Sequence, residues 1–249
     1  MKQQVWRLVG MLLVSIVCLQ LYFLARIAVM TVVAPQSTTF QRSEALRLAR
    51  EKHQILWSQE WVDDDQISKH LKRAVIASED AGFMEHGGVE WDAIQKALDK
   101  NQKAQEQADK RAARLAKVAP NKPPPVPKVI GGSTISQQLA KNLFLSAERT
   151  FLRKGQEIAL TYMLETLLGK HRILEIYLNN VEWGEGVFGA QAAARHYFRV
   201  DAERLGPNQA ARLAVMLPAP KRFEKRPSSP YVMSRAGTIE ARMGAVEIP

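Results

Sequence analysis

Residues 131–142 read Gly-Gly-Ser-Thr-Ile-Ser-Gln-Gln-Leu-Ala-Lys-Asn, and this is the most informative stretch of the chain. It predicts a flexible glycine loop that leads into a helix with Ser and Thr at its start. Gln137 and Gln138 precede Lys141 by four and three residues, so the three side chains can share one helical face. Loop amides, a helix N-terminus and a lysine suit an anionic, sugar-bearing ligand. A capped helix with a solvated polar face fits the same residues.

The N-terminal region predicts a membrane anchor. Residues 8–25 form a nearly continuous apolar run between Arg7 and Arg26, and apolar residues resume at 27–34. About 20 apolar residues cross a bilayer, and an arginine near one end can reach the interface. The alternative is a cleaved signal peptide, but the run is long for one and no clear cleavage site follows. Lys2 and Arg7 place the N-terminal tail in the cytoplasm and residues 35–249 outside it.

Charge and cysteine content narrow the function classes. The net charge is +10, which first suggests nucleic acid, but the anchor argues against that partner. Anionic lipid head groups and a lipid carrying a pyrophosphate fit better. The one cysteine, Cys18, lies inside the anchor, so the remainder holds no disulfide and no cysteine-based zinc site.

Apolar spacing after the anchor predicts a predominantly α-helical domain with few strands. The triad Asp63-Asp64-Asp65 predicts the start of a helix that ends near Glu79. Further helical patterns begin at 91, 133, 147, 174, 189 and 207. Residues 99–128 are basic and then proline-rich, which predicts a charged helix or a disordered loop before a polyproline stretch. The favoured interpretation is a surface insertion that the fold tolerates. The functional alternative is a mobile flap that contacts lipid head groups or the nascent product.

Residues 79–88 read Glu-Asp-Ala-Gly-Phe-Met-Glu-His-Gly-Gly and predict an acid–base site. Glu79 and Asp80 end a helix, where the macrodipole disfavours their charged forms and raises the pKa. A carboxylate of this kind suits a general base, with Phe83 shielding it and His86 donating a hydrogen bond. An exposed acidic turn with a structural histidine is the alternative.

Two later segments are ambiguous by themselves. Arg149, Arg153 and Glu157 step by four residues and can share a helix face, but an ordinary Arg153–Glu157 surface pair explains the same spacing. Gly184 and Gly186, with Gly189, predict a tight loop between core helices.

These four segments, in this order, resemble the motifs of glycosyltransferase family 51, the peptidoglycan glycosyltransferases. The resemblance covers about residues 62–220. No transpeptidase domain follows before Pro249, as in the monofunctional, membrane-anchored members of Gram-negative bacteria. The resemblance implies a lysozyme-like helical fold, with an anchor at 1–34 and a glycosyltransferase domain at 35–249. Two departures are the long insertion and Gln209-Ala210-Ala211, where the family often has Glu-Ala-Ala; we interpret the latter as a structural helix.

The resemblance also implies an activity and roles for individual residues. Lipid II would be polymerised into linear glycan strands by inverting β-1,4 transfer, with release of undecaprenyl pyrophosphate. Glu79 matches the catalytic base and Glu157 the second functional glutamate. Positions that match substrate or pyrophosphate contacts are Asp80, Ser133, Gln137, Gln138, Lys141, Asn142, Arg149, Arg153 and Lys154. Positions that match structural motif residues are Phe83, His86, Gly131, Gly132, Asn179, Gly184 and Gly186.

The resemblance implies the inner membrane as location, a periplasmic catalytic domain and sensitivity to moenomycin. Expected partners are lipid II, the nascent glycan strand, membrane lipids and, in addition, cell-division or elongation proteins, but no nucleic acid. No cofactor is obligatory, although a divalent cation such as Mg²⁺ could bridge the pyrophosphate. A lytic muramidase and a non-catalytic scaffold are the alternatives; the former has no use for the cationic third segment, and loss of Glu79 or Glu157 would have indicated the latter.

Overall fold

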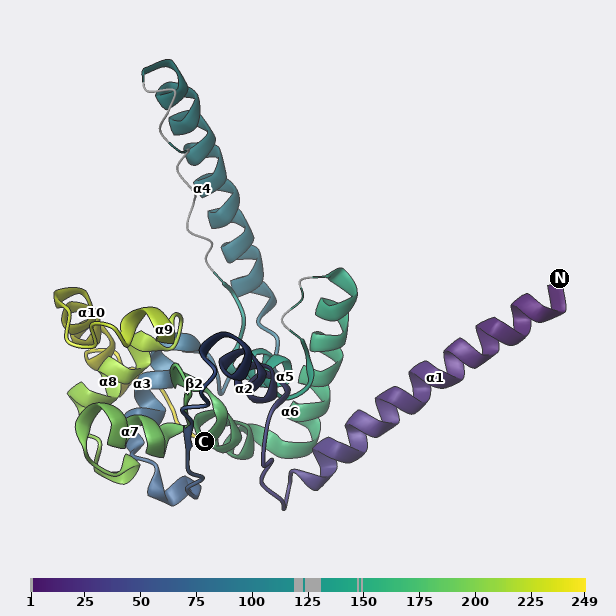
Figure 1. Ribbon diagram of the computed structural model, residues 1–249, viewed down its shortest axis with the longest axis horizontal. Helices are drawn as coiled ribbons and strands as arrows, with labels where there is room; N and C mark the ends of the chain where they lie inside the picture. The colour runs from purple at the N-terminus through teal and green to yellow at the C-terminus, as the bar shows by residue number, and fades with distance from the viewer. Residues whose placement is uncertain (1, 119–122, 124–130, 147, 149) are drawn as a thin grey trace.

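The computed structural model describes residues 2–118, 123, 131–146, 148 and 150–249 (Figure 1). The prediction of a predominantly α-helical protein is confirmed. The helices are α1 Lys2–Val29, α2 Thr39–Lys52, α3 Lys69–Glu79, α4 Trp91–Val118, α5 Ile135–Phe144, α6 Phe151–Asn180, α7 Ala190–Phe198, α8 Pro207–Met216, α9 Pro220–Phe223 and α10 Pro230–Glu240. Three short 3₁₀ turns are η1 Asp64–Gln66, η2 Ala202–Arg204 and η3 Met243–Ala245, and three short strands are β1 Ser58–Gln59, β2 Glu182–Gly184 and β3 Val187–Phe188.

Helix α1 extends away from the body of the molecule and leaves most of its apolar side chains exposed (Figure 1). Its 28 residues make it long and apolar enough to cross a membrane, and it is the one such helix in the described part of the chain. At its C-terminal end Ile27 is buried, and the ring of Phe23 contacts that of Phe144 in α5. The amide of Gln20 exchanges hydrogen bonds with Gln156 of α6, at 2.9 and 3.1 Å. Helix α1 is therefore joined to α5, which carries the 131–142 motif, and to α6, which carries Arg153 and Glu157.

The core forms where α3, α5, α6 and α8 bring their apolar faces together. Leu71 and Val75 of α3, Leu139 of α5, Leu164 of α6 and Leu213 of α8 are at most 1 % exposed. Burying side chains of this size is the main stabilising contribution to such a fold, about 1.5–3 kcal/mol for each fully buried one.

The predicted start of the helix that ends at Glu79 was wrong. The Asp63–Asp65 triad leads into the short turn η1, and Asp63 makes no side-chain capping bond. Helix α3 begins after Ser68, whose Oγ accepts a hydrogen bond from the His70 amide. Ser68 caps the helix because its hydroxyl reaches one of the amides that lack an intrahelical partner. The predicted end at Glu79 is confirmed.

Helix α6 consists of two helical parts, as the separate patterns from about 147 to 168 and from 174 predicted. The parts meet at a kink at Gly169, which has the non-helical angles φ 69° and ψ 168°. Glycine adopts this positive φ readily, so the helix is interrupted at this residue. Residues 147 and 149 lie outside the described part of the chain.

The basic insertion begins as an extension of α4, which projects from the body (Figure 1). Of the two predicted forms, the charged helix is confirmed as far as Val118. The polyproline prediction falls largely on residues 119–122 and 124–130, outside the described part. The first turn of α4 packs closely against the glycine loop at 131–132. A Cβ on Gly132 would lie only 2.9 Å from the Ala93 carbonyl oxygen.

The three strands form a small sheet in the order β1-β3-β2, with β3 parallel to β1 and antiparallel to β2. Gly184 ends β2, and Gly186 turns the chain with φ 74°. The Ser58 amide donates to the Gly186 carbonyl at 2.8 Å, which draws the 56–58 segment against this turn. The predicted tight glycine loop is therefore present, and it is built around a short hairpin.

Gly186→Ala should destabilise the protein by at least about 2 kcal/mol, because a left-handed φ strains an alanine and its Cβ would clash with the Leu56 carbonyl. Chemical denaturation of the full chain measures the change. Gly237→Ala is the matched control, since a Cβ there meets no atom within 4 Å and the site is helical. Equal stability of the two variants would contradict the assignment.

Candidate active site

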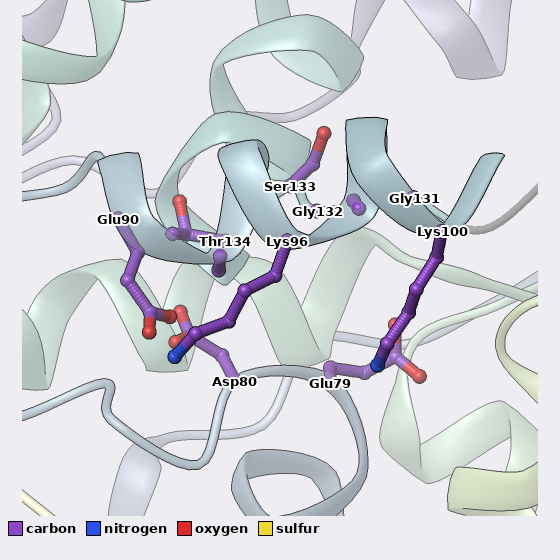
Figure 2. A pocket seen from close by; sticks show the side chains of 11 residues that line it. Glu79, Asp80, Glu90, Lys96, Lys100, Gly131, Gly132, Ser133 and Thr134 are labelled. Atoms are coloured by element: carbon purple, nitrogen blue, oxygen red, sulfur yellow. The ribbon is translucent and has the colours of Figure 1, made fainter. Parts of the chain in front are cut away.

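Glu79 is the last residue of α3 and lines a cavity of about 240 Å³ together with Asp80, Glu90 and the glycine loop (Figure 2). Lys96 and Lys100, from the root of α4, line the same cavity and extend toward the two acids (Figure 2). Burial raises the pKa of Glu79, and the nearby Asp80 carboxylate raises it further, against hydrogen bonds from Gln138 and Ser78. The expected direction is confirmed, with burial as its largest cause.

A buried tyrosine and Gln138 hold the Glu79 carboxylate in place. Gln138 Nε2 donates to Glu79 Oε2 at 3.2 Å, and the Tyr177 hydroxyl donates to Gln138 Oε1 at 2.9 Å. Burial keeps the pKa of Tyr177 well above its ordinary value, so its hydroxyl remains a donor. Sequence reasoning missed Tyr177, because its position in an apolar helical pattern resembles ordinary core packing.

Asp80 connects the end of α3 to the start of α5. Its Oδ1 accepts from His86 Nε2 at 2.8 Å, and its Oδ2 accepts from the Ile135 amide at 2.9 Å. The Gly88 amide donates to His86 Nδ1 at 3.0 Å, which fixes the tautomer with the proton on Nε2. The substrate contact expected for Asp80 stays a prediction.

Asp80, His86 and Glu90 also bring three possible ligand atoms within 4.8 Å of one another. His86 accepts a hydrogen bond at Nδ1 and donates one from Nε2, so in this tautomer it has no free lone pair for a metal. Each Asp80 oxygen accepts one hydrogen bond and keeps a second lone pair, so Asp80 and Glu90 are the two members of this cluster that could still bind a cation.

A second group of residues holds the 83–88 turn against α5 and α6. Lys170 Nζ donates to the His86 carbonyl and to Glu165 Oε1, both at 2.7 Å, and lies 4.6 Å from the centre of the Phe83 ring. Ser136 Oγ donates to Glu165 Oε1 at 2.5 Å. Apart from the Lys170–Glu165 pair, these contacts join residues 29 to 87 positions apart, so no local sequence pattern identifies them.

A larger cavity of about 480 Å³ lies on the other side of Gln138. Helix α5 lines it with Gln137, Gln138, Lys141 and Asn142, and Ser133 lines both cavities. Because Gln138 also contacts Glu79, this acid of the smaller cavity lies one hydrogen bond from the wall of the larger one. The far walls are formed by Phe40, Ser43, Leu145, Ser146, Val181, Glu182, Leu217, Pro218 and Pro220.

Helix α6 places charged groups in this larger cavity. Glu157 is 4 % exposed and accepts from Arg153 Nη1 at 3.2 Å and from Lys154 Nζ at 2.5 Å. The expected alternative of a surface pair is wrong for Glu157, which is buried beneath its two cations. Arg149 lies outside the described residues, so its expected contact stays a prediction.

Gln137 has two functions in the structure. Its Oε1 accepts from the Thr134 amide at 3.1 Å and completes a capping box at the start of α5. Its Nε2 is buried and has no hydrogen-bond acceptor among the described residues, although Gln137 lines the larger cavity. An unsatisfied buried donor at a cavity wall favours a polar ligand there.

Glu182, at the opposite wall, is a second residue that sequence reasoning missed. Burial raises its pKa to about 7, while Lys221, 3.4 Å away, opposes the shift. It follows the end of α6 in a three-residue strand, so no periodic pattern indicates that its side chain faces the cavity.

Comparison with known proteins settles the family. A family model described as Transglycosylase matches residues 45–110 and 122–244, which is most of the chain. The chain belongs to this transglycosylase family. Proteins named "Biosynthetic peptidoglycan transglycosylase" from Burkholderia thailandensis, Paraburkholderia xenovorans and Burkholderia lata are 51 %, 48 % and 50 % identical over 230 residues. Each alignment covers 92 % of this chain and 82 %, 87 % and 85 % of the respective relative.

Membership of the transglycosylase family confirms the family prediction and the helical, lysozyme-like fold. The remaining motif residues have structural positions in this fold. Asn179 is buried and exchanges hydrogen bonds with the backbone of Val62, with both distances 2.9 Å. Gly131 and Gly132 line the smaller cavity beside Glu79, whereas Gly184 ends β2 and Gly186 lies in the turn between β2 and β3.

Proposed function

We propose that this transglycosylase polymerises lipid II into linear peptidoglycan strands. The 4-hydroxyl of an acceptor GlcNAc attacks C1 of the donor MurNAc, the C1–O bond to pyrophosphate breaks, and undecaprenyl pyrophosphate leaves with the bonding electrons. The new bond is β-1,4 because a single displacement inverts the α-linked donor. The position of Glu79 in one cavity, one hydrogen bond from the wall of a second, carries this proposal, since a transfer reaction needs two substrates on either side of one base.

Glu79 takes the proton of the attacking hydroxyl. Burial favours its neutral form, so the carboxylate has a higher proton affinity than an exposed glutamate and is a better base near neutral pH. Gln138, held by Tyr177, orients the carboxylate.

The larger cavity holds the donor pyrophosphate. Pyrophosphate is already a good leaving group, so it needs neutralisation of charge more than protonation. Lys141, Arg153 and Lys154 supply positive charge along two walls, and Glu157 orients the last two. Ser133, Gln137 and Asn142 offer polar contacts to the attached sugar. A divalent cation at the pyrophosphate remains a prediction, and no step here depends on it.

If α1 is a membrane anchor, it implies where the protein lies in the cell and which partners it meets. Helix α1 would span the inner membrane once, with the cytoplasm at its start and residues 35–249 in the periplasm. Lipid II and the growing strand then approach from the membrane in which α1 is embedded. Contacts with division or elongation proteins, and a role of residues 99–128 in holding head groups or product, remain predictions.

The deciding experiment incubates the purified full chain with labelled lipid II in detergent, with and without moenomycin. We expect polymer that lysozyme digests, and its loss with the inhibitor. Finished glycan strands form the parallel substrate. Cleavage of those strands without polymer growth would replace the proposal with a lytic activity. The absence of both reactions would indicate a scaffold protein.

Lys96 and Lys100 give a separate prediction about the acceptor. The acceptor carries its own pyrophosphate, and these two ammonium groups lie in the cavity of the base. Replacing both with Gln should raise the KM for lipid II about tenfold, as expected for lost charge-assisted contacts. Lys110→Gln, farther along α4, is the control in the same detergent and should leave KM unchanged. An equal KM in all three proteins would remove the two lysines from the acceptor site.

A further inference from the structure

A third cavity, of about 490 Å³, lies where the anchor meets the body of the protein. Tyr22, Arg26 and Val29 lie at helical spacing at the end of α1 and form one wall together with Ala25. Met30, residues 33–37 after the helix, and Arg42 of α2 complete the lining. All the lining residues are described, and none of them is an Asp or a Glu. The cavity therefore combines apolar walls with two positive charges.

Arg26 lies at a boundary of the expected membrane span. Residues 8–25 separate it from Arg7, and at 1.5 Å per residue they extend about 27 Å, close to the thickness of the hydrocarbon core, about 30 Å. The two arginines thus mark the two edges of the apolar layer. Arg42 follows residues 30–38, which connect α1 to α2, and it lies on the polar side of the same edge.

The two guanidinium groups contact aromatic rings and neutral oxygens. Arg26 lies 5.3 Å from the ring centre of Phe144 and 5.8 Å from that of Tyr22. Arg42 donates to the Ser37 carbonyl at 3.2 Å and to Thr39 Oγ1 at 3.0 Å. No carboxylate pairs with either group in the described part of the chain. An arginine at this edge extends its guanidinium into the head-group region, where lipid phosphates are the available counter-charges.

We propose that this cavity binds one anionic membrane phospholipid, with its phosphate between Arg26 and Arg42. The guanidinium fork matches the oxygens of a phosphate, and one acyl chain lies along Tyr22 and Ala25, on the membrane side of Arg26. An anionic lipid is favoured over a zwitterionic one because the cavity contributes two positive charges and no negative one. The inference rests on the membrane orientation proposed above, and it does not require lipid II.

The lipid would hold the anchor at a fixed position beside α2 and α5. Thr39, the first residue of α2, donates its hydroxyl hydrogen to the Leu143 carbonyl of α5 at 2.9 Å. Phe144, which stacks under Arg26, is the last residue of α5. The same helix lines the larger cavity with Lys141 and Asn142. The bound lipid is thus next to the helix that carries donor contacts, but outside the reaction site.

The test uses the full chain in mild detergent and native mass spectrometry, with phosphatidylglycerol and phosphatidylcholine titrated separately. We expect the wild-type protein to retain one phosphatidylglycerol at lower lipid concentration than phosphatidylcholine. Arg26→Gln and Arg42→Gln should each weaken phosphatidylglycerol retention about fivefold, and Arg26→Lys should restore part of it. Arg7→Gln removes the same charge at the other end of the helix and should change nothing.

Equal retention of the two lipids by the wild-type protein, or an equal loss in Arg7→Gln, would overturn the proposal. Arg42 is exposed, so its variant decides the question if Arg26→Gln lowers the thermal midpoint. Lipid II is absent from this experiment, so its result is separate from that of the polymerisation assay. A protein that retains phosphatidylglycerol but makes no polymer would keep the lipid site and lose the proposed function.

Discussion

Glu79→Gln is expected to slow lipid II polymerisation by about 10²–10⁴ while the protein stays folded, because a positioned general base contributes that much to rate. Glutamine keeps the size of the side chain and can still bond to Gln138, but it cannot accept the proton of the attacking hydroxyl. Initial rates with labelled lipid II, together with thermal unfolding, measure the two effects.

The matched control for this variant is Glu85→Gln, in the turn that follows α3. Glu85 is exposed and lines neither of the two cavities, so its neutralisation should leave the rate unchanged. A Glu79→Gln protein that polymerises near the wild-type rate would remove Glu79 from the role of base. Loss of activity in both variants would indicate an effect of net charge.

The pH dependence of the wild-type rate tests the same group independently. A base works only when deprotonated, so the rate should rise with pH as Glu79 loses its proton. Burial raises the pKa of Glu79, and that rise should therefore occur at higher pH than for an ordinary glutamate. Gln138→Ala removes a hydrogen bond that lowers this pKa, so it should move the rise to still higher pH.

Arg153→Ala combined with Lys154→Ala is expected to reduce kcat by about 10²–10³, the usual cost of removing donors that stabilise developing charge. Both groups line the larger cavity and contact Glu157, which is 4 % exposed. The double variant should also lower the thermal midpoint, since it leaves that buried carboxylate with fewer partners.

Two measurements separate catalysis from structure in this variant. Activity is expressed per folded molecule, and the thermal midpoint shows whether the double variant is folded at the assay temperature. A low rate per folded molecule means that the cations act on the pyrophosphate. A wild-type rate per folded molecule would make them structural. Arg235→Ala, on the exposed side of α10, controls for loss of positive charge.

The sequence predicted those features that depend on neighbouring residues. The span of α1, the capped start of α5 at Thr134 and the end of α3 at Glu79 each follow from local apolar spacing or a capping residue. The role of Ser68 as the N-cap of α3 was missed, because the three aspartates at 63–65 formed a stronger helix-start signal than one serine.

The rest of the candidate site depends on residues far apart in the chain. The Tyr177–Gln138 hydrogen bond joins positions 39 residues apart, and the Lys170–His86 contact joins positions 84 apart. Strands of two or three residues are also too short to show an alternating pattern. Contacts of these kinds form only when the helices pack, so periodicity and motif spacing carry no signal for them.

Helix α6 carries residues from both parts of the candidate site. Its first half carries Arg153, Lys154 and Glu157, and its second half carries Tyr177, which is joined to Glu79 through Gln138. The two halves meet at Gly169. In the proposed reaction, the angle at this one joint sets how the cations at the pyrophosphate lie relative to the hydrogen bonds that hold the base, and a ligand that bends it would disturb both together.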